Sequence, residues 1–332
     1  MKALVYTNPH ELHWGEEPEP RPQPGEALIR IEAAGICGSD MHAFHGDDSR
    51  RIPPLVLGHE AAGTAESGRL AGRRVVINPL ITCGHCIACL DGRTNLCRTR
   101  ELIGMNRPGA FAELIAIPER NLVPLPAGME PARAVLSEPA AAALHAVRLA
   151  GCAAARPLSE ARVLVLGAGA IGLLAALFLS SAGAHAVLLG DTNALRRRTA
   201  QACGVLEVYD PLATPPEASS FDVVIEAVGS AATRAAAVAA AKPGSVIVHI
   251  GLQEDSGGLD VRTLTLAEIT FIGTYAYTVV DFHAALAALQ RGLPGGFDWV
   301  EQRPLREGQG AFEDLDAGRT AAAKIVLLPM PV

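Results

Sequence analysis

The second half of the chain alternates short apolar runs with helix-forming segments, and this alternation constrains the fold more than any other feature. Strand followed by helix, repeated, requires parallel pairing of the strands, with helices covering both faces of the sheet. The sequence therefore predicts an α/β fold with a doubly wound parallel sheet in residues 139–276. The expected strands are 162–166, 186–189, 221–226 and 245–250, and the expected helices lie near 169–181, 194–202 and 231–241.

Residues 1–138 have a different pattern of apolar residues, which predicts a β-rich domain. Short apolar runs such as 27–31 and 75–77 are separated by turns rich in proline and glycine. Beyond residue 276 the alternation stops, and a helix at 281–291 followed by a strand at 324–328 would return the chain to the first domain. A length of 332 residues suits two domains, namely 1–138 joined by 277–332, and 139–276.

Composition and charge exclude several classes of function. The net charge of −7 repels a phosphate backbone, and an aromatic content of 4% offers few side chains for stacking bases, so no nucleic-acid partner is expected. The N-terminal segment lacks the apolar stretch of a secretory signal, which predicts a cytoplasmic protein. Residues 163–190 are uncharged and long enough to span a bilayer, but their glycines and serines favour strand, turn, helix and strand, so no membrane partner is expected.

A glycine-rich turn indicates a dinucleotide site. Gly167, Gly169 and Gly172 follow a predicted strand and open a predicted helix, and Asp191 ends the next strand. Glycines at this spacing allow a tight turn and close approach of the backbone to a pyrophosphate, while the helix N-terminus attracts phosphate charge. Asp191 would accept hydrogen bonds from ribose hydroxyls and repel a 2'-phosphate, which favours NAD over NADP. Alternatively, Asp191 caps the following helix, and the arginines at 196–198 could bind that phosphate.

Four closely spaced cysteines predict a structural metal site near residues 80–100. Cys83, Cys86, Cys89 and Cys97 can close a tetrahedron around zinc, and a closed four-sulfur site is structural. A redox thiol pair and an iron–sulfur cluster are the alternatives. Since the seven cysteines are an odd number in a chain without an export signal, a disulfide framework is not expected.

Three separated segments carry residues suited to a catalytic zinc. A thiol, an imidazole and carboxylates from distant segments, with water completing the shell, form a typical open zinc site. Each residue alone has a simpler interpretation, such as a buried thiol or a helix N-terminal acid. The segments contribute Cys37, Ser39, Asp40 and His42; His59 and Glu60; and Glu138.

Taken in order along the chain, these motifs resemble the zinc-dependent medium-chain dehydrogenases/reductases, in the branch of polyol (sorbitol, idonate) and threonine dehydrogenases. The resemblance covers nearly the whole chain and rests on Gly-Ile-Cys-Gly-Ser-Asp-Met-His at 35–42, Gly-His-Glu at 58–60, the four cysteines and the glycine turn. It implies a GroES-like β-rich catalytic domain, a Rossmann NAD-binding domain, and hydride transfer between a secondary alcohol and NAD.

The resemblance also assigns roles around the catalytic zinc. Cys37 and His59 are implied to be ligands, and Glu60 and Glu138 are the acidic members of the shell, with the direct ligand left open between them. Asp40 is implied to orient the histidine ligand.

Further roles concern the proton relay, the cofactor and the partner subunit. Ser39 and His42 match the relay that carries the alcohol proton outward. Arg196 matches an arginine that flanks the adenine, and the segment 268–273 would pair across a twofold axis in a homodimer or homotetramer. The residues expected to contact NAD are Gly167, Gly169, Ile171, Gly172, Asp191 and Arg196.

The chain departs from the family pattern in two places. The stretch from His59 to Val75 is shorter than usual, which predicts that a surface hairpin near the zinc segment is trimmed. Ala276 stands where sorbitol dehydrogenase relatives carry an arginine, so their polyol contacts do not carry over. Two other functions remain open from the sequence: a zinc-independent quinone or enoyl reductase, and a non-catalytic or regulatory NAD-binding protein.

Overall fold

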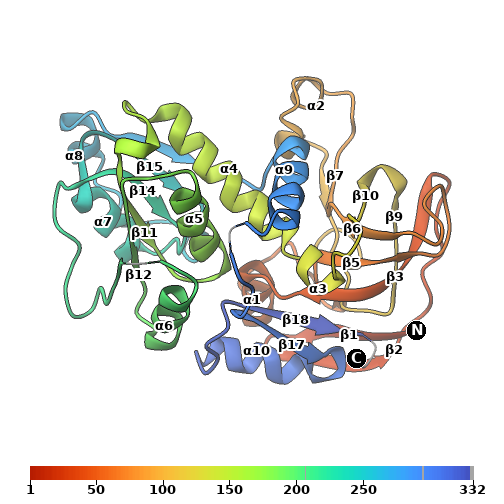
Figure 1. Cartoon of the computed structure of the whole chain (residues 1–332). Helices are drawn as coiled ribbons and strands as arrows, with labels where there is room; N and C mark the ends of the chain where they lie inside the picture. Colours follow the sequence, from red (N-terminus) through yellow and green to blue (C-terminus); the bar gives the residue numbers. More distant parts are fainter. Residues whose placement is uncertain (206, 294, 330–332) are drawn as a thin grey trace.

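The chain forms two sheet-based halves joined by a pair of helices (Figure 1). The computed structural model describes residues 1–205, 207–293 and 295–329. Within these ranges, no helix combines the length and apolar character needed to cross a bilayer.

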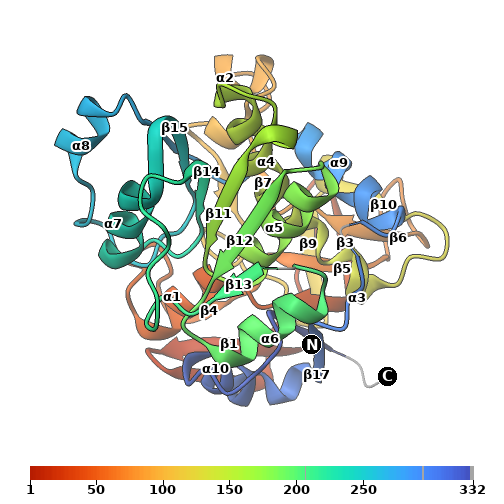
Figure 2. The ribbon, with the colours of Figure 1, turned by 60° about the vertical axis from the view of Figure 1, so that its left-hand side comes forward.

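The second half contains the predicted doubly wound sheet, which is confirmed. Its six strands run parallel in the order β13-β12-β11-β14-β15-β16 (Figure 2). Alternate side chains along the strands enter two different cores, one shared with α4 and α5 and the other with α7 and α8. The strands are β11 (Arg162–Leu166), β12 (Ala186–Gly190), β13 (Glu207–Tyr209), β14 (Phe221–Glu226), β15 (Ala241–His249) and β16 (Thr270–Gly273). The helices are α4 (Ser137–Ala153), α5 (Ala170–Ser181), α6 (Ala194–Ala202), α7 (Ala231–Ala240) and α8 (Val261–Leu266).

The first half is built on a mostly antiparallel seven-stranded sheet. Its order is β10-β6-β5-β3-β18-β17, and β9 also pairs with β3. The late strand β18 lies directly beside β3, so the segment after residue 276 does return to the N-terminal sheet. The strands are β3 (Glu26–Gly35), β5 (Glu60–Ala65), β6 (Arg74–Ile77), β9 (Leu114–Pro118), β10 (Leu122–Pro124), β17 (Val300–Pro304) and β18 (Lys324–Leu328).

Smaller elements surround this sheet. A three-stranded sheet has the order β2-β1-β4, and β7 pairs with β8 beside the projecting segment that carries α2 (Figure 1). Their bounds are β1 (Lys2–Asn8), β2 (Glu11–Glu16), β4 (Leu55–Val56), β7 (Leu80–Ile81), β8 (Glu101–Leu102), α1 (Gly38–His45), α2 (Ile87–Leu90), α3 (Pro131–Ala134) and α10 (Gly308–Asp316). Short 3-10 turns occupy Thr94–Leu96, Glu119–Asn121, Leu158–Glu160 and Leu305–Glu307.

Helices α4 and α9 (Val279–Gln290) pack together between the two halves (Figure 1). Asp281 on α9 accepts hydrogen bonds from His145 Nδ1 at 2.8 Å and Arg148 Nε at 3.0 Å, both on α4. It also accepts the Thr278 hydroxyl at 2.6 Å, which caps α9. Because a buried carboxylate is costly unless it is paired, this cluster fixes the start of α9 against α4.

The turn between β11 and α5 has the shape that its glycines predict. Gly167 has a φ of 98°, a left-handed conformation that disfavours other residues. A Cβ on Gly172 would overlap the carbonyl oxygen of Gly167. By contrast, a Cβ on Gly169 would meet no atom within 4 Å.

We therefore expect Gly172→Ala to lower the thermal unfolding midpoint markedly, because the added methyl must push the turn away from the helix. Gly169→Ala, in the same turn, is the matched control and should unfold near the wild-type temperature. Differential scanning calorimetry of both variants checks this. Equal unfolding midpoints for the two variants would contradict the packing argument.

Candidate functional site

The first half places a reactive segment at the end of its central strand. β3 ends at Gly35, and Cys37 is the N-cap residue of α1. The Cys37 amide donates to Asp40 Oδ2 at 3.0 Å, which closes a capping box at the start of the helix. Short-range hydrogen bonding thus fixes Cys37 relative to the residues of α1.

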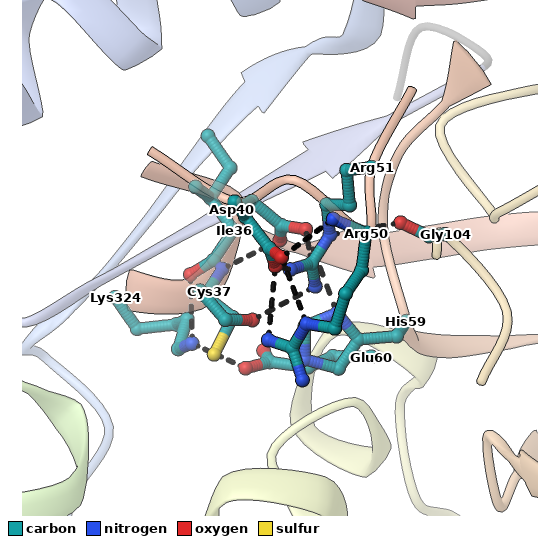
Figure 3. A network of polar contacts seen from close by, with 11 residues as sticks. Ile36, Cys37, Asp40, Arg50, Arg51, His59, Glu60, Gly104 and Lys324 are labelled. Atoms are coloured by element: carbon teal, nitrogen blue, oxygen red, sulfur yellow. Dashed lines mark hydrogen bonds and ion pairs between the residues drawn. The ribbon is translucent and has the colours of Figure 1, made fainter. Parts of the chain in front are cut away.

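Three potential metal ligands from this region converge. One donor atom from each of Cys37, His59 and Glu60 lies within 4.8 Å of the other two. Glu60 begins β5, which pairs with β3 so that Glu60 stands opposite Gly35, and Figure 3 shows the three side chains meeting. Glu60 Oε2 is buried and has no hydrogen-bond partner among the described residues. Thiolate, imidazole and carboxylate are donors that zinc prefers, so the residues present fit a zinc ion.

Asp40 occupies the position expected of a residue that orients His59. Its Oδ1 lies 3.5 Å from His59 Nδ1, and the carboxylate is fully buried. Burial alone would raise the pKa of Asp40, but the neighbouring His59 and Arg51 and the Cys37 amide outweigh it and lower the pKa. An ionised Asp40 facing Nδ1 leaves the other ring nitrogen of His59 free for a metal.

Sequence reasoning missed a lysine in this site. Lys324, the first residue of β18, is 3% exposed, and its Nζ donates to Glu60 Oε1 at 2.6 Å and to the carbonyl of Ile36 at 2.7 Å (Figure 3). The signal was present in the sequence, since a lysine heads an otherwise apolar strand, yet nothing local identifies its partner. One oxygen of Glu60 is thereby tied to a cation and the other stays free.

Glu138 lies close to this cluster without joining the group of converging donors. It sits in the first turn of α4 and is buried. Burial, opposed by His59 and reinforced by Glu60, raises the pKa of Glu138 to about 7. Of the two acidic residues expected in the shell, Glu60 is the one whose oxygen meets the Cys37 and His59 donors.

The two residues expected to form the proton relay line a cavity beside α1. Ser39 and His42, both on α1, border a cavity of about 420 Å³ together with Arg50 and the loop at 252–255 that follows β15. Burial is the main factor that lowers the pKa of His42, which favours the neutral ring. The cavity therefore joins α1 to the C-terminal end of the parallel sheet.

The four clustered cysteines form the other potential metal site. All four sulfurs lie within 4.8 Å of one another, with Cys83 Sγ 3.9 Å from Cys89 Sγ and 3.6 Å from Cys97 Sγ. A tetrahedron of sulfurs about 2.3 Å from zinc has edges of about 3.8 Å, so the spacing fits. Backbone amides of His85 and Cys86 lower the pKa of Cys83 to about 6, which favours the thiolate that zinc requires, whereas burial raises the pKa of Cys89 to about 11.

The glycine turn opens onto a cavity that reaches Cys37. A cavity of about 200 Å³ is bordered by Gly169, Ile171, Gly172 and Arg196 on one side and by Cys37 and Lys324 on the other. An extended ligand bound over the turn would therefore reach the Cys37–His59–Glu60 cluster. This arrangement brings four of the predicted dinucleotide residues and the predicted zinc ligand Cys37 to one cavity.

The carboxylate of Asp191 accepts hydrogen bonds from the backbone on both sides of it, including the glycine turn. Its Oδ2 accepts the Ala168 amide at 2.7 Å and its Oδ1 accepts the Asn193 amide at 2.7 Å. The N-cap of α6 is Asn193, whose side chain accepts the amides of Leu195 and Arg196. The alternative role of Asp191 as the cap of this helix is therefore wrong.

The raised pKa of Glu138 predicts how the stability of the metal-free chain depends on pH. A carboxyl with a pKa of about 7 when folded, against about 4.5 when unfolded, binds its proton more tightly in the folded state. Its stabilising contribution is complete below pH 4.5 and is lost as the pH rises through 7. His59 acts in the same direction: burial lowers its pKa, but Asp40 and Cys37 outweigh burial and raise it.

We expect the urea midpoint of the chelator-treated protein to fall between about pH 5 and about pH 8, and Glu138→Gln to make that fall smaller. Unfolding followed by circular dichroism checks both. Equal slopes in the wild type and the variant would contradict the assignment of the raised pKa to Glu138.

Comparison with known proteins identifies both halves of the chain. Residues 23–127 match the family "Alcohol dehydrogenase GroES-like domain", and residues 170–291 match "Zinc-binding dehydrogenase". The predicted GroES-like domain is thereby confirmed beside the parallel-sheet domain.

Individual relatives span nearly the whole chain. L-galactonate-5-dehydrogenase of Escherichia coli is 34% identical over 85% of each chain, and an L-threonine 3-dehydrogenase of Stenotrophomonas maltophilia is 31% identical over 98% of this chain and 99% of its own. A putative zinc-binding dehydrogenase from Sinorhizobium meliloti, solved bound to NADP, is 30% identical, superposes with a TM-score of 0.86 and covers 99% of each chain. The chain therefore belongs to the zinc-dependent medium-chain dehydrogenases/reductases, in the branch of the polyol and threonine dehydrogenases.

Proposed function

We propose that the protein is a zinc-dependent oxidoreductase that transfers a hydride between a secondary alcohol, such as a polyol, a sugar acid or a related compound, and NAD. The observation that carries this proposal is that Cys37, a member of the Cys37–His59–Glu60 cluster, borders the same cavity as the glycine turn of the parallel sheet. Residues 1–138 with 277–332 then form the catalytic domain, and residues 139–276 bind the dinucleotide.

The residues around the cleft have different roles in the proposed reaction. A zinc ion held by Cys37, His59 and an acidic residue would act as a Lewis acid that makes the substrate hydroxyl more acidic. Asp40 keeps the His59 ring oriented through Nδ1. Ser39 accepts the hydroxyl proton and passes its own proton toward His42 and solvent, along the cavity that both residues line. A neutral serine is a weak base, so the acidification of the substrate must come mainly from the metal.

Lys324 and Glu138 bear on which acidic residue would bind the proposed catalytic zinc. Because Lys324 neutralises one oxygen of Glu60, the second oxygen can turn toward the metal without leaving the first unpaired. Glu138, with its raised pKa, approaches the same space from α4. We infer that Glu60 contributes to the inner shell and that Glu138 is the neighbouring acidic member.

The preference for NAD over NADP is proposed from Asp191. Its carboxylate is held at the edge of the turn by two backbone amides and lies where a ribose would be bound. A 2'-phosphate there would meet this fixed negative charge. Arg196 borders the cavity over the glycine turn, and we assign it to the adenine.

Two further features complete the proposed holoenzyme. The four cysteines would hold a closed structural zinc that stabilises the projecting segment around α2. β16 is an edge strand of the parallel sheet, and Val261 and Leu266 beside it are exposed apolar residues. These features support pairing with a second copy as a homodimer or homotetramer.

The proposal predicts about two zinc ions per chain and NAD-dependent oxidation of at least one compound in a panel of alditols, aldonates, amino alcohols and secondary alcohols. We expect Cys37→Ser to lower the zinc content to about one and to abolish turnover, while NAD still binds. Cys152→Ser is the control, because Cys152 is exposed and lies outside both cysteine sites. Metal analysis by mass spectrometry, turnover assays and fluorescence titration with NADH provide the three measurements. Full activity of metal-free Cys37→Ser would overturn the mechanism.

Asp191→Asn tests the cofactor preference separately. The amide keeps the size of the side chain and can still accept one backbone hydrogen bond, but it removes the charge that opposes a 2'-phosphate. We expect the ratio of kcat/KM for NAD to that for NADP to fall by about tenfold or more, equivalent to about 1.4 kcal/mol. A wild-type enzyme that already prefers NADP would refute the role given to Asp191.

A further inference from the structure

Arg51 is a buried arginine that contacts the relay segment. Its side chain is 0% exposed, and its Nε donates to the carbonyl of Gly104 at 3.0 Å. Nη1 binds the carboxylate of Asp48, and Nη2 donates to Ser39 Oγ at 3.1 Å. Each nitrogen of the guanidinium therefore donates to an acceptor, and one of these acceptors is the hydroxyl proposed to carry the proton.

The contact with Arg51 restricts what the Ser39 hydroxyl can do. A serine hydroxyl has one proton to donate and two lone pairs to accept with, whereas arginine can only donate. Because Nη2 occupies one lone pair, the Ser39 proton cannot point toward Arg51. One lone pair and the proton remain for other partners, which is what a relay requires: it accepts on one side and donates on the other.

The same guanidinium also balances the buried charges that surround α1. Arg51 Nη2 lies 4.0 Å from Asp40 Oδ1, and the carboxylates of Asp40 and Asp48 are both almost completely buried. Its planar fork can serve Gly104, Asp48 and Ser39 simultaneously, whereas a lysine ammonium is a single point charge. Fixing the Ser39 contact therefore depends on the geometry of arginine and not only on its charge.

We propose that Arg51 is a positioning residue that sets the direction of proton transfer through Ser39. This inference rests on the proposed dehydrogenase function. In the step, the Ser39 oxygen takes the substrate hydroxyl proton through its free lone pair as it releases its own proton toward His42 and solvent. Ser39 is neutral before and after, so charge and protons balance. Arg51 neither gains nor loses a proton, and it acts only through the orientation of the serine.

A double-mutant cycle between Arg51 and Ser39 tests this role. We expect Arg51→Lys to lower kcat by about tenfold, to leave KM for NAD unchanged and to enlarge the solvent deuterium isotope effect on kcat. In the Ser39→Ala background, the same Arg51→Lys substitution should cause no further loss. Zinc content and NADH affinity, measured on the same samples, should stay at wild-type values in Arg51→Lys.

Arg50 provides a matched control. It also binds Asp48, through Nε at 2.8 Å and Nη2 at 3.0 Å, and in the described part of the chain its side-chain hydrogen bonds go to that carboxylate. Whatever loss Arg50→Lys causes should multiply with the loss caused by Ser39→Ala, because Arg50 does not bind Ser39 and a lysine keeps a positive charge beside Asp48, which can still hold Arg51. Coupling with Ser39 that occurs for Arg51→Lys and not for Arg50→Lys supports the positioning role.

A second variant tests the same role if Arg51→Lys does not fold. Asp48→Asn removes the charge that binds Nη1 of the guanidinium, and it should give a similar loss of kcat that disappears in Ser39→Ala. Two results would overturn the role of Arg51 and leave the proposed function intact. One is an unchanged kcat in Arg51→Lys. The other is that the losses in Arg51→Lys and in Asp48→Asn both multiply with the loss in Ser39→Ala. Absence of turnover in the zinc-loaded wild type across the alcohol panel would instead refute the proposed function, and the relay with it.

Discussion

The ion pair between Lys324 and Glu60 connects the elements on which the site depends. Glu60 lies on β5, Lys324 on β18, and β3 runs between them, so the pair spans three neighbouring strands. Both charges are buried, and either one alone would be costly to keep in the core. A Cβ on Gly35 would overlap Glu60 Oε2, so a side chain at that position would displace the Glu60 carboxylate. The pair thus fixes the strand registers that bring Cys37 near His59.

Charge is balanced locally throughout the region around α1. Asp40 faces His59 and Arg51, Asp48 faces Arg50 and Arg51, and Glu60 faces Lys324. Each of these three carboxylates therefore has a cationic or titratable partner. Glu138 differs, because burial and Glu60 keep its pKa high. It is the acidic group whose charge state a bound cation would change most.

Local sequence patterns predicted most of the fold and the two groups of potential metal ligands. The strand–helix alternation arises because the strands of a parallel sheet are buried on both faces. Gly167 and Gly172 are required by the backbone conformation and close packing of a single turn. The three-residue strand β13 was missed because Glu207–Tyr209 is too short to show a period. Lys324 and Arg51 were missed for another reason. Their partners lie in distant or irregular segments, and a lysine in a strand or an arginine in a loop carries no local sign of a buried contact.

The place of β18 in the N-terminal sheet has a consequence for biosynthesis. A ribosome makes Glu60 and the residues around it long before Lys324, which follows 264 positions later. Until then β3 lacks its neighbour on one side, while the parallel sheet has all its strands available and can fold as a unit. The nascent protein must therefore protect an unpaired strand edge and an uncompensated acidic side chain during synthesis. Competence to bind the proposed catalytic metal would come as one of the last events of folding.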